Sequence, residues 1–257
     1  MRSLVTLSLL VCTLALAQAP TPRLVEDWRH AYRGEDATGP HVIALWQFEP
    51  GAELKDASGK GHDLTLRGAR SSAEGRFGGG LESFRGWPDK DESHCAVAAN
   101  DRALSPTGAF TIELWLCPKP ELEGCATAFL LDKMYGDKTD YQLVLTGTEK
   151  NPLKRLRANL GFGDAVVSFT SDPARYEPGV WRHVAFTYDG DGTAHFYRDG
   201  VCLGGRTEPG RSAICPGKLP LSLGDRGGSL YRGFPGVLDQ VRLCNGVMTF
   251  GPVAMAC

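Results

Sequence analysis

Residues 181–200 read WRHVAFTYDGDGTAHFYRDG, and this stretch decides the fold. Two strand-like runs, 181–188 and 193–198, flank the turn 189–192, which consists of two Asp-Gly pairs. Such pairs between strand-forming runs are the strongest short-range signal for a β-hairpin. A further Asp-Gly pair at 199–200 turns the chain into another short apolar run. The segment therefore predicts antiparallel strands joined by tight turns.

Short strand-like runs separated by turn residues continue along most of the chain. Residues 110–116 alternate between two faces, as a half-buried strand does. One face carries Phe110, Ile112, Leu114 and Leu116, and the other carries Thr111, Glu113 and Trp115. Further short strands are predicted at 41–48, 64–66, 80–84, 95–98, 129–132, 141–146, 156–162, 166–170, 201–203, 219–223 and 237–243. No sustained helix separates these runs, so the sequence predicts an all-β fold, an antiparallel β-sandwich.

Composition agrees with one β domain. The chain has 257 residues, of which 42% are hydrophobic, enough for a buried core. Its 32 glycines and 16 prolines suit many short strands and turns. Lys+Arg 28 against Asp+Glu 30 gives a net charge of -2. This balance lacks the basic field that nucleic acid or an anionic membrane surface would require.

The N-terminus has the pattern of a secretory signal peptide, predicted over residues 1–17. Arg2 supplies the positive end, residues 4–16 are mostly apolar, and Ala15-Leu16-Ala17 forms a small-residue cleavage site. No stretch reaches the ~20 apolar residues that a membrane-spanning helix needs. We therefore expect a secreted, periplasmic or cell-surface protein with no membrane span.

The segment 18–40 is predicted as an extension that precedes the main domain at 41–257. Leu24, Trp28 and either Ala31 or Tyr32 fall at helical spacing, which predicts one short helix ending near Gly34.

Seven cysteines follow the predicted signal peptide, and an oxidising compartment favours disulfides. Cys117 and Cys125 flank one polar loop, and Cys202 and Cys215 flank another, so each pair could close a hairpin. Cys95 with Cys244 is the pairing that remains. The alternative is that several of these cysteines are reduced and buried.

Several motifs together resemble the laminin G-like, concanavalin A-like lectin/glucanase jelly-roll domains. They occur in the family's order across about residues 41–250: ALWQFE (44–49), DASGKGHDL (56–64), GRFGGGL (75–81), FTIELWL (110–116), WRHVAFTYDG (181–190), YRDG (197–200) and FPGVLDQVRL (234–243). The resemblance implies a jelly-roll sandwich, a fold that serves many functions.

A structural Ca²⁺ site is the sharpest local hypothesis. Ca²⁺ takes several oxygen ligands, and the 56–63 stretch offers acidic residues around glycines. The resemblance implies Asp56, the His62 carbonyl and Asp239 as ligands, with Glu49 and Asp63 as alternates. Gln240 stands where the family carries an acid, which removes one anionic ligand. The alternative is that Asp56 only accepts hydrogen bonds within its own turn.

A sugar site needs an aromatic platform beside polar groups. Trp115 and Glu113 share the face of 110–116 that lies opposite the core residues, and the loop residues Trp87, Tyr135 and Tyr231 could rim the same surface. For Trp115 the alternative is packing, because the family carries Trp at this position.

No catalytic motif is present in the sequence. The glycosidases that share this jelly roll carry an E-x-D-x-x-E or E-x-D-x-E array, whereas Glu113 stands alone on its strand. The sequence also lacks a GxSxG elbow, an HExxH motif and a P-loop. We therefore expect a non-catalytic recognition module for a glycan or an extracellular protein, with a role in carbohydrate binding or adhesion. Two alternatives stay open: the accessory domain of a truncated extracellular glycoside hydrolase or sialidase, and a structural envelope or matrix scaffold.

Overall fold

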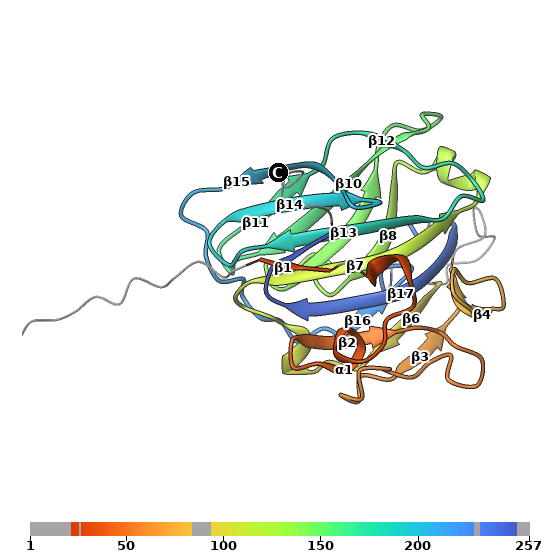
Figure 1. The fold of residues 1–257 in the computed structure, drawn as a ribbon. Helices are drawn as coiled ribbons and strands as arrows, with labels where there is room; N and C mark the ends of the chain where they lie inside the picture. Colours follow the sequence, from red (N-terminus) through yellow and green to blue (C-terminus); the bar gives the residue numbers. More distant parts are fainter. Residues whose placement is uncertain (1–21, 26, 84–93, 229–231, 251–257) are drawn as a thin grey trace, which may run out of the picture.

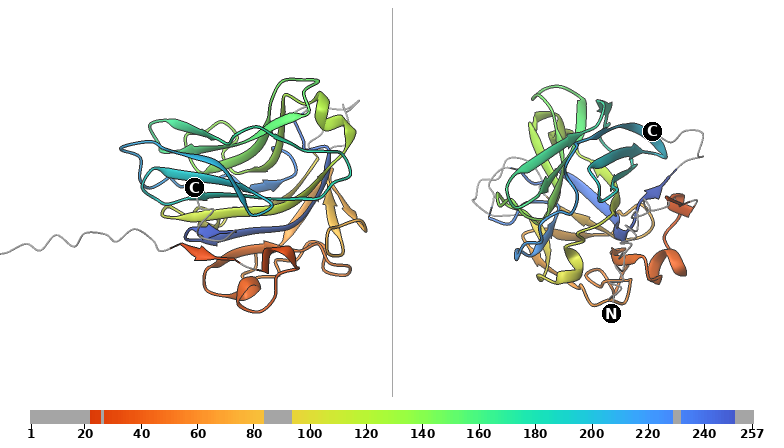
Figure 2. Two further views of the ribbon diagram at one scale, coloured as in Figure 1. Left: turned by 45° about the horizontal axis from the view of Figure 1, so that its top comes forward. Right: turned by 90° about the vertical axis from the view of Figure 1, so that its left-hand side faces the viewer.

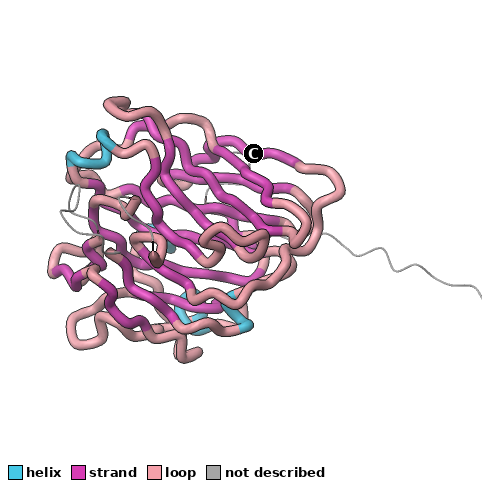
Figure 3. Tube along the Cα trace, turned by 180° about the vertical axis from the view of Figure 1, so that it is seen from behind, coloured by secondary structure: helices cyan, strands magenta, loops and turns pink. Residues whose placement is uncertain are grey.

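A computed structural model describes residues 22–25, 27–83, 94–228 and 232–250. Two antiparallel sheets of eight strands each make up most of this part (Figure 1). Seen from behind, the molecule consists mainly of strands and loops, with only short helices (Figure 3). The predicted antiparallel β-sandwich is therefore confirmed. Among the described residues, no helix is long and apolar enough to span a bilayer.

The first sheet is called the β8 sheet. It contains β3 (Leu64–Arg67), β6 (Cys95–Ala98), β8 (Thr127–Asp132), β9 (Tyr141–Thr146), β10 (Leu153–Gly161), β11 (Val166–Thr170), β12 (Ala174–Arg175) and β16 (Leu221–Leu223). Its strand order is β11-β10-β9-β8-β16-β6-β3, and β12 pairs with β10.

The second sheet is called the β7 sheet. It contains β2 (Val42–Trp46), β4 (Arg70–Ser72), β5 (Gly80–Glu82), β7 (Phe110–Pro118), β13 (Arg182–Tyr188), β14 (Thr193–Arg198), β15 (Val201–Thr207) and β17 (Gly236–Asn245). Its order is β15-β14-β13-β7-β17-β5-β4, and β2 also pairs with β17.

The main core lies between the two sheets. The alternation of β7 sends Phe110, Ile112, Leu114 and Leu116 into this core, where all four are buried. The β8 sheet contributes the opposite wall, including Leu131, Leu143 and Leu160. The burial of such side chains is the main favourable contribution to folding, on the order of 1.5–3 kcal/mol for each large one. The face of the β7 sheet that points away from this core is called the outer face.

The predicted hairpin forms as expected. β13 and β14 are antiparallel, and Tyr188 lies opposite Ala194. The Asp189 carboxylate accepts hydrogen bonds from the backbone N–H groups of Asp191 (2.7 Å) and Thr193 (2.9 Å). Gly192 has a φ of 92°, a conformation that favours glycine. These contacts show ordinary turn chemistry.

The N-terminal segment differs from its prediction. Leu24 belongs to a short strand, β1 (Arg23–Leu24), which pairs with β18 (Met248–Thr249), and Trp28 lies in the 3-10 helix η1 (Asp27–Arg29). Gly34, with a φ of 54°, precedes the one-turn helix α1 (Glu35–Thr38). The prediction of one helix ending near Gly34 is therefore wrong, because the apolar residues follow the surface of the β7 sheet and not a helix face. The signal peptide at 1–17 lies outside the described residues.

We call residues 27–38 the strap. It lies against the outer face of the β7 sheet, where the red segment passes in front of β7 and β17 (Figures 1 and 2). Trp28, Tyr32 and Ala37 of the strap are buried there in a second apolar cluster. The sheet's contribution to this cluster includes Trp115 and Ala185. The β7 sheet is therefore covered on both faces.

The three predicted disulfides do not form. Cys95, Cys117, Cys125, Cys215 and Cys244 carry free thiols. The pairings Cys117–Cys125, Cys202–Cys215 and Cys95–Cys244 are therefore wrong. Cys202 is disulfide-bonded, but Cys215 is not its partner.

For Cys117–Cys125 and for Cys95–Cys244, the physical reason is that the two cysteines of the predicted pair lie on different faces or in different sheets of the sandwich. Cys125 packs into the main core, whereas Cys117 follows Trp115 on the outer-facing positions of β7. Cys244 packs under the N-terminal segment on the outer face of the β7 sheet. Cys95 is in the other sheet, one residue from the core residue Ala96, and so points away from the main core.

Candidate functional site

Three polar side chains gather on the outer face of the β7 sheet. Glu113 comes from the middle of β7, His183 from β13 and Arg242 from β17, the two strands that flank β7. All three are at most 1% exposed. We call them the buried cluster.

A bulge in β17 brings Arg242 into this cluster. The register between β17 and β7 shifts between Asp239 and Arg242, which lie opposite Trp115 and Glu113. Gln240 takes a φ of 49° at this point. In a regular strand, residues three apart face opposite sides, so the extra residue is what lets both Asp239 and Arg242 face outward.

Glu113 is the centre of the hydrogen bonding. Its Oε1 accepts a hydrogen bond from Arg242 Nε at 2.5 Å, and its Oε2 lies 2.9 Å from His183 Nε2. Oε2 also accepts a hydrogen bond from the Tyr32 hydroxyl of the strap. Burial alone would raise the pKa of Glu113, but the Arg242 guanidinium and the bond with His183 outweigh it and lower that pKa. The carboxyl is thus held as the anion.

Aromatic rings surround the buried cluster. The Trp28 ring stacks on the His183 ring, with centroids 4.7 Å apart, and lies 5.8 Å from the Trp115 ring. Phe77, from the loop before β5, meets Trp115 edge-on at 5.6 Å. The Arg76 guanidinium lies 4.9 Å from the centre of the Trp115 ring. The outer face therefore combines charged groups with aromatic surface.

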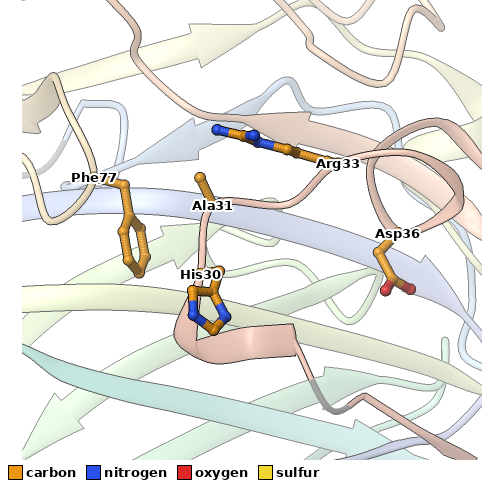
Figure 4. Close-up of a pocket in the computed structure, with 5 residues that line it drawn as sticks. All are labelled: His30, Ala31, Arg33, Asp36 and Phe77. Carbon is orange, nitrogen blue, oxygen red and sulfur yellow. The ribbon is translucent and has the colours of Figure 1, made fainter.

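An open cleft of ≈ 520 Å³ adjoins this region. The strap supplies one side of it, and Phe77 comes from the loop opposite (Figure 4). The lining residues are His30, Ala31, Arg33, Asp36 and Phe77. His30 and Arg33 are exposed, and neither side chain has an ion-pair partner among the described residues. The cleft thus offers an aromatic face, a free guanidinium, an imidazole and a carboxylate to a ligand.

The predicted ligand-binding residues are not brought together. Glu113 and Trp115 share the outer face, as expected from the alternation of β7, but the strap covers them and they are 1% and 5% exposed. Tyr135 lies between β8 and β9 of the other sheet and is 46% exposed. The Arg226 guanidinium lies 4.7 Å from the centre of its ring. Trp87 and Tyr231 lie outside the described residues.

The residues that sequence reasoning missed had only weak signals. His183 and Arg242 stand at outward positions of their strands, where a polar residue is normally solvated. Tyr32 was seen only as one position of a helical pattern. Phe77 lies in a glycine-rich stretch that resembled a family motif, without any mark of a site.

The predicted calcium ligands are already engaged. Asp56 accepts hydrogen bonds from Leu45 N, Ser58 N and Oγ, and His62 N, at 2.6–3.0 Å. Although burial acts to raise the pKa of Asp56, these bonds, that from Ser58 foremost, lower it. The His62 carbonyl accepts a hydrogen bond from Trp46 Nε1 at 2.8 Å. These oxygens therefore serve as hydrogen-bond acceptors that stabilise their own turn, as the alternative to a calcium site predicts.

The other candidate ligands do not complete a site. Asp239 accepts hydrogen bonds from Phe77 N and Gln240 N, and burial, with a smaller effect of Glu49, raises its pKa to about 7. Asp63 pairs with Lys55 at 2.7 Å. Among the described residues, no group of three or more His, Cys, Asp or Glu side chains is placed to hold a metal ion. The calcium site therefore stays a prediction, and its proposed ligands Asp56, the His62 carbonyl and Asp239 accept hydrogen bonds from the protein itself.

Comparison with solved structures identifies the same fold in binding domains. The binding domain of Paraclostridial Mosquitocidal Protein 1 matches 80% of this chain with a TM-score of 0.63 at 15% identity. Domain 4 of AbnA, a GH43 extracellular arabinanase from Geobacillus stearothermophilus in complex with arabinotriose, matches 81% with a TM-score of 0.58 at 19% identity. The botulinum neurotoxin serotype G binding domain matches 80% with a TM-score of 0.60 at 14% identity.

The lengths of these neighbours differ. This chain spans 94% of the AbnA domain, but 49% of the mosquitocidal protein's domain and 48% of the serotype G domain. No curated protein matches the sequence. The family model of the concanavalin A-like lectin/glucanases superfamily matches residues 90–254, well over half of the chain. With its two antiparallel sheets and this match, the chain belongs to the concanavalin A-like lectin/glucanases superfamily.

Proposed function

We propose that this protein is an exported, non-catalytic recognition module that binds an oligosaccharide in the cleft between the strap and Phe77. The observation that carries the proposal is the composition of that cleft. An aromatic ring can stack on the apolar face of a sugar, while Arg33, His30 and Asp36 can bind its hydroxyls. A cleft of ≈ 520 Å³ is in the size range of small-ligand sites.

The fold supports a binding role without specifying the ligand. One structural neighbour, the AbnA domain, is a single module of an arabinanase and was solved with arabinotriose. The neighbours from toxins are described as binding domains. Because one fold serves many functions, the ligand class rests on the cleft itself.

The electrostatics of the outer face support a role other than hydrolysis. A glycosidase needs a general acid whose pKa is raised, next to a second carboxylate. The pKa of Glu113 is instead lowered, and its nearest charged partner is Arg242. For export, the support is the signal-peptide pattern of residues 1–17.

The test is a glycan array, followed by calorimetric titration with the oligosaccharide that binds best. We expect Phe77→Ala and Arg33→Ala each to weaken binding at least tenfold, about 1.4 kcal/mol. Two matched controls are Tyr135→Ala, an exposed aromatic in the other sheet, and Arg67→Ala, an exposed arginine on β3. Binding that survives both cleft substitutions and is lost in Tyr135→Ala would move the site to the β8 sheet.

A further inference from the structure

The strap covers a face that is built unlike an ordinary packing surface. The outer side of an antiparallel sheet is normally either solvated and polar or buried and apolar. Here Glu113, His183 and Arg242 stand side by side at the centre of the sheet, and Trp28 and Tyr32 of the strap lie over them. Burying three polar groups needs compensation by hydrogen bonds.

Tyr32 supplies that compensation in the way that a bound ligand would. Its hydroxyl donates a hydrogen bond to Glu113, and its ring lies 3.7 Å from the Arg242 guanidinium. Its backbone N–H donates to Gln240 Oε1 at 3.2 Å, and its carbonyl accepts from Gln47 Nε2 at 3.0 Å. Of these contacts, the hydroxyl on the Glu113 carboxylate is one that a hydroxyl of a bound sugar could make in its place.

The strap leaves part of this face unsatisfied. His183 Nδ1 and Gln240 Nε2 are buried and have no hydrogen-bond partner among the described residues. His183 is 1% exposed, and its other nitrogen is engaged with Glu113. Buried polar atoms are rarely left without a partner, and such exceptions need an explanation. A ligand with several hydroxyls could satisfy both atoms, because a hydroxyl can donate as well as accept, whereas the indole N–H of the Trp28 ring that stacks on His183 is already bonded to the Phe250 carbonyl.

The strap has little structure of its own. It contains one 3-10 turn, Asp27–Arg29, and one α-helical turn, Glu35–Thr38. The ion pair that ties it to β1, Arg23 with Asp36 at 3.3 Å, is partly exposed, and such pairs contribute little. The strap is therefore held on the β7 sheet by its buried side chains, Trp28 and Tyr32 foremost, and by their hydrogen bonds, so a ligand that displaces it must replace those contacts.

We propose that the strap is a displaceable cover, and that Glu113, His183, Arg242 and Trp115 form a binding site for an oligosaccharide that is used in place of the cleft, because His30, Arg33 and Asp36 of the cleft move away with the strap. A ligand hydroxyl replaces that of Tyr32 on Glu113, and a sugar ring replaces Trp28 on Trp115 and His183. The inference rests on the proposed function, because it assigns the same ligand class to the covered face.

The experiment compares the full-length protein with Trp28→Ala and Tyr32→Phe, which loosen the strap in different ways. Each protein is titrated calorimetrically with arabinotriose, xylotetraose and cellotetraose. At least one of these probes is expected to bind at least tenfold more tightly to both variants than to the parent protein. Adding Glu113→Gln to Trp28→Ala should abolish that gain. Circular dichroism and thermal unfolding check that every variant is folded.

Hydrogen exchange on the parent protein gives a readout that needs no substitution. At saturating probe, the strap amides, including that of Tyr32, should exchange faster than without probe. Unchanged or slower exchange, together with no gain of affinity in either folded variant, would overturn the proposal.

Arg33→Ala separates the two proposals. If it removes all binding to the parent protein while the strap variants bind no better, the cleft function stands and the covered site fails. If the parent protein binds no probe but Trp28→Ala does so through Glu113, the covered site stands and the cleft fails.

Discussion

At the scale of single residues, the outer face shows how charge is kept inside this protein. Glu113 and Arg242 are both at most 1% exposed, and their desolvation is costly unless their attraction and hydrogen bonds offset it. Each oxygen of Glu113 has a partner, and the guanidinium of Arg242 also donates to the Asp36 carbonyl at 2.6 Å. The pair therefore couples the strap to β7 and β17.

Asp225 illustrates the opposite case, a buried carboxyl whose pKa burial raises more than its neighbours, the Arg226 charge among them, lower it. Burial raises the pKa of Asp225 to about 6, although the N–H groups of His94 and Arg226 act to lower it. A carboxyl whose pKa is raised in the folded state binds a proton more tightly there than in the unfolded chain. Its contribution to stability is therefore present at low pH and is lost as the pH rises from about 4 to about 6.

We accordingly expect Asp225→Asn to flatten the pH dependence of stability across that window. The shift of roughly two pKa units corresponds to about 3 kcal/mol at most. Urea unfolding at pH 4, 5, 6 and 7 measures it, with Asp164→Asn, an exposed aspartate, as the control. Equal slopes for the parent protein and Asp225→Asn would contradict the assignment.

At the scale of elements, the sequence predicted side-chain orientation correctly where a strand keeps a regular two-residue alternation. The alternation of β7 predicted which side chains enter the core and that Glu113 and Trp115 share the other face. The pattern could not reveal the bulge at Gln240, because a one-residue insertion leaves no mark in hydrophobicity. For the same reason it could not place Arg242 beside Glu113. The short strands β4 and β12 were missed because edge pairing, without an apolar pattern, defines them.

The β13–β14 turn gives a prediction at this scale. A Cβ on Gly192 would lie 2.5 Å from the Glu208 carbonyl oxygen, and its φ of 92° disfavours any other residue. Gly210 has a φ of 77° but no atom within 4 Å of the same position. Gly210→Ala should therefore cost about 1–2 kcal/mol from the backbone alone.

Gly192→Ala carries that backbone cost and the clash as well, so its loss of stability should be clearly larger. Chemical unfolding of both variants measures the difference. Equal losses would show that the loop carrying Glu208 moves aside freely.

At the scale of the whole molecule, the calcium hypothesis can be tested by its effect on thermal stability, because an ion that binds only the folded chain raises the Tm. An ion that bound only the folded chain at a hundred times its Kd would add about 2.7 kcal/mol, which raises the Tm of a domain this size by roughly 5–10 °C. Because Asp56 and the His62 carbonyl are engaged in hydrogen bonds, we expect the same Tm in excess EDTA and in millimolar CaCl₂. Asp239→Asn serves as the companion variant, and a calcium-dependent rise that this substitution removes would restore the predicted site.

The distribution of cysteines over the layers also concerns the whole molecule. Cys95 and Cys244 are fully buried on opposite sheets, and burial raises the pKa of each thiol to about 12. A protonated, buried thiol reacts slowly. N-ethylmaleimide should therefore leave both unmodified in the native protein at neutral pH.

In denaturant without reductant, the same reagent should modify all five cysteines that carry free thiols among the described residues, because unfolding exposes the buried ones. Cys202 should react only after reduction, since it is disulfide-bonded. Peptide mapping by mass spectrometry reads each position separately, and the reduced, denatured chain is the control for complete labelling. If Cys117 and Cys125 both resist labelling until reductant is added, they form a disulfide. In that case Cys117 cannot lie on the outer face of β7 while Cys125 lies in the main core.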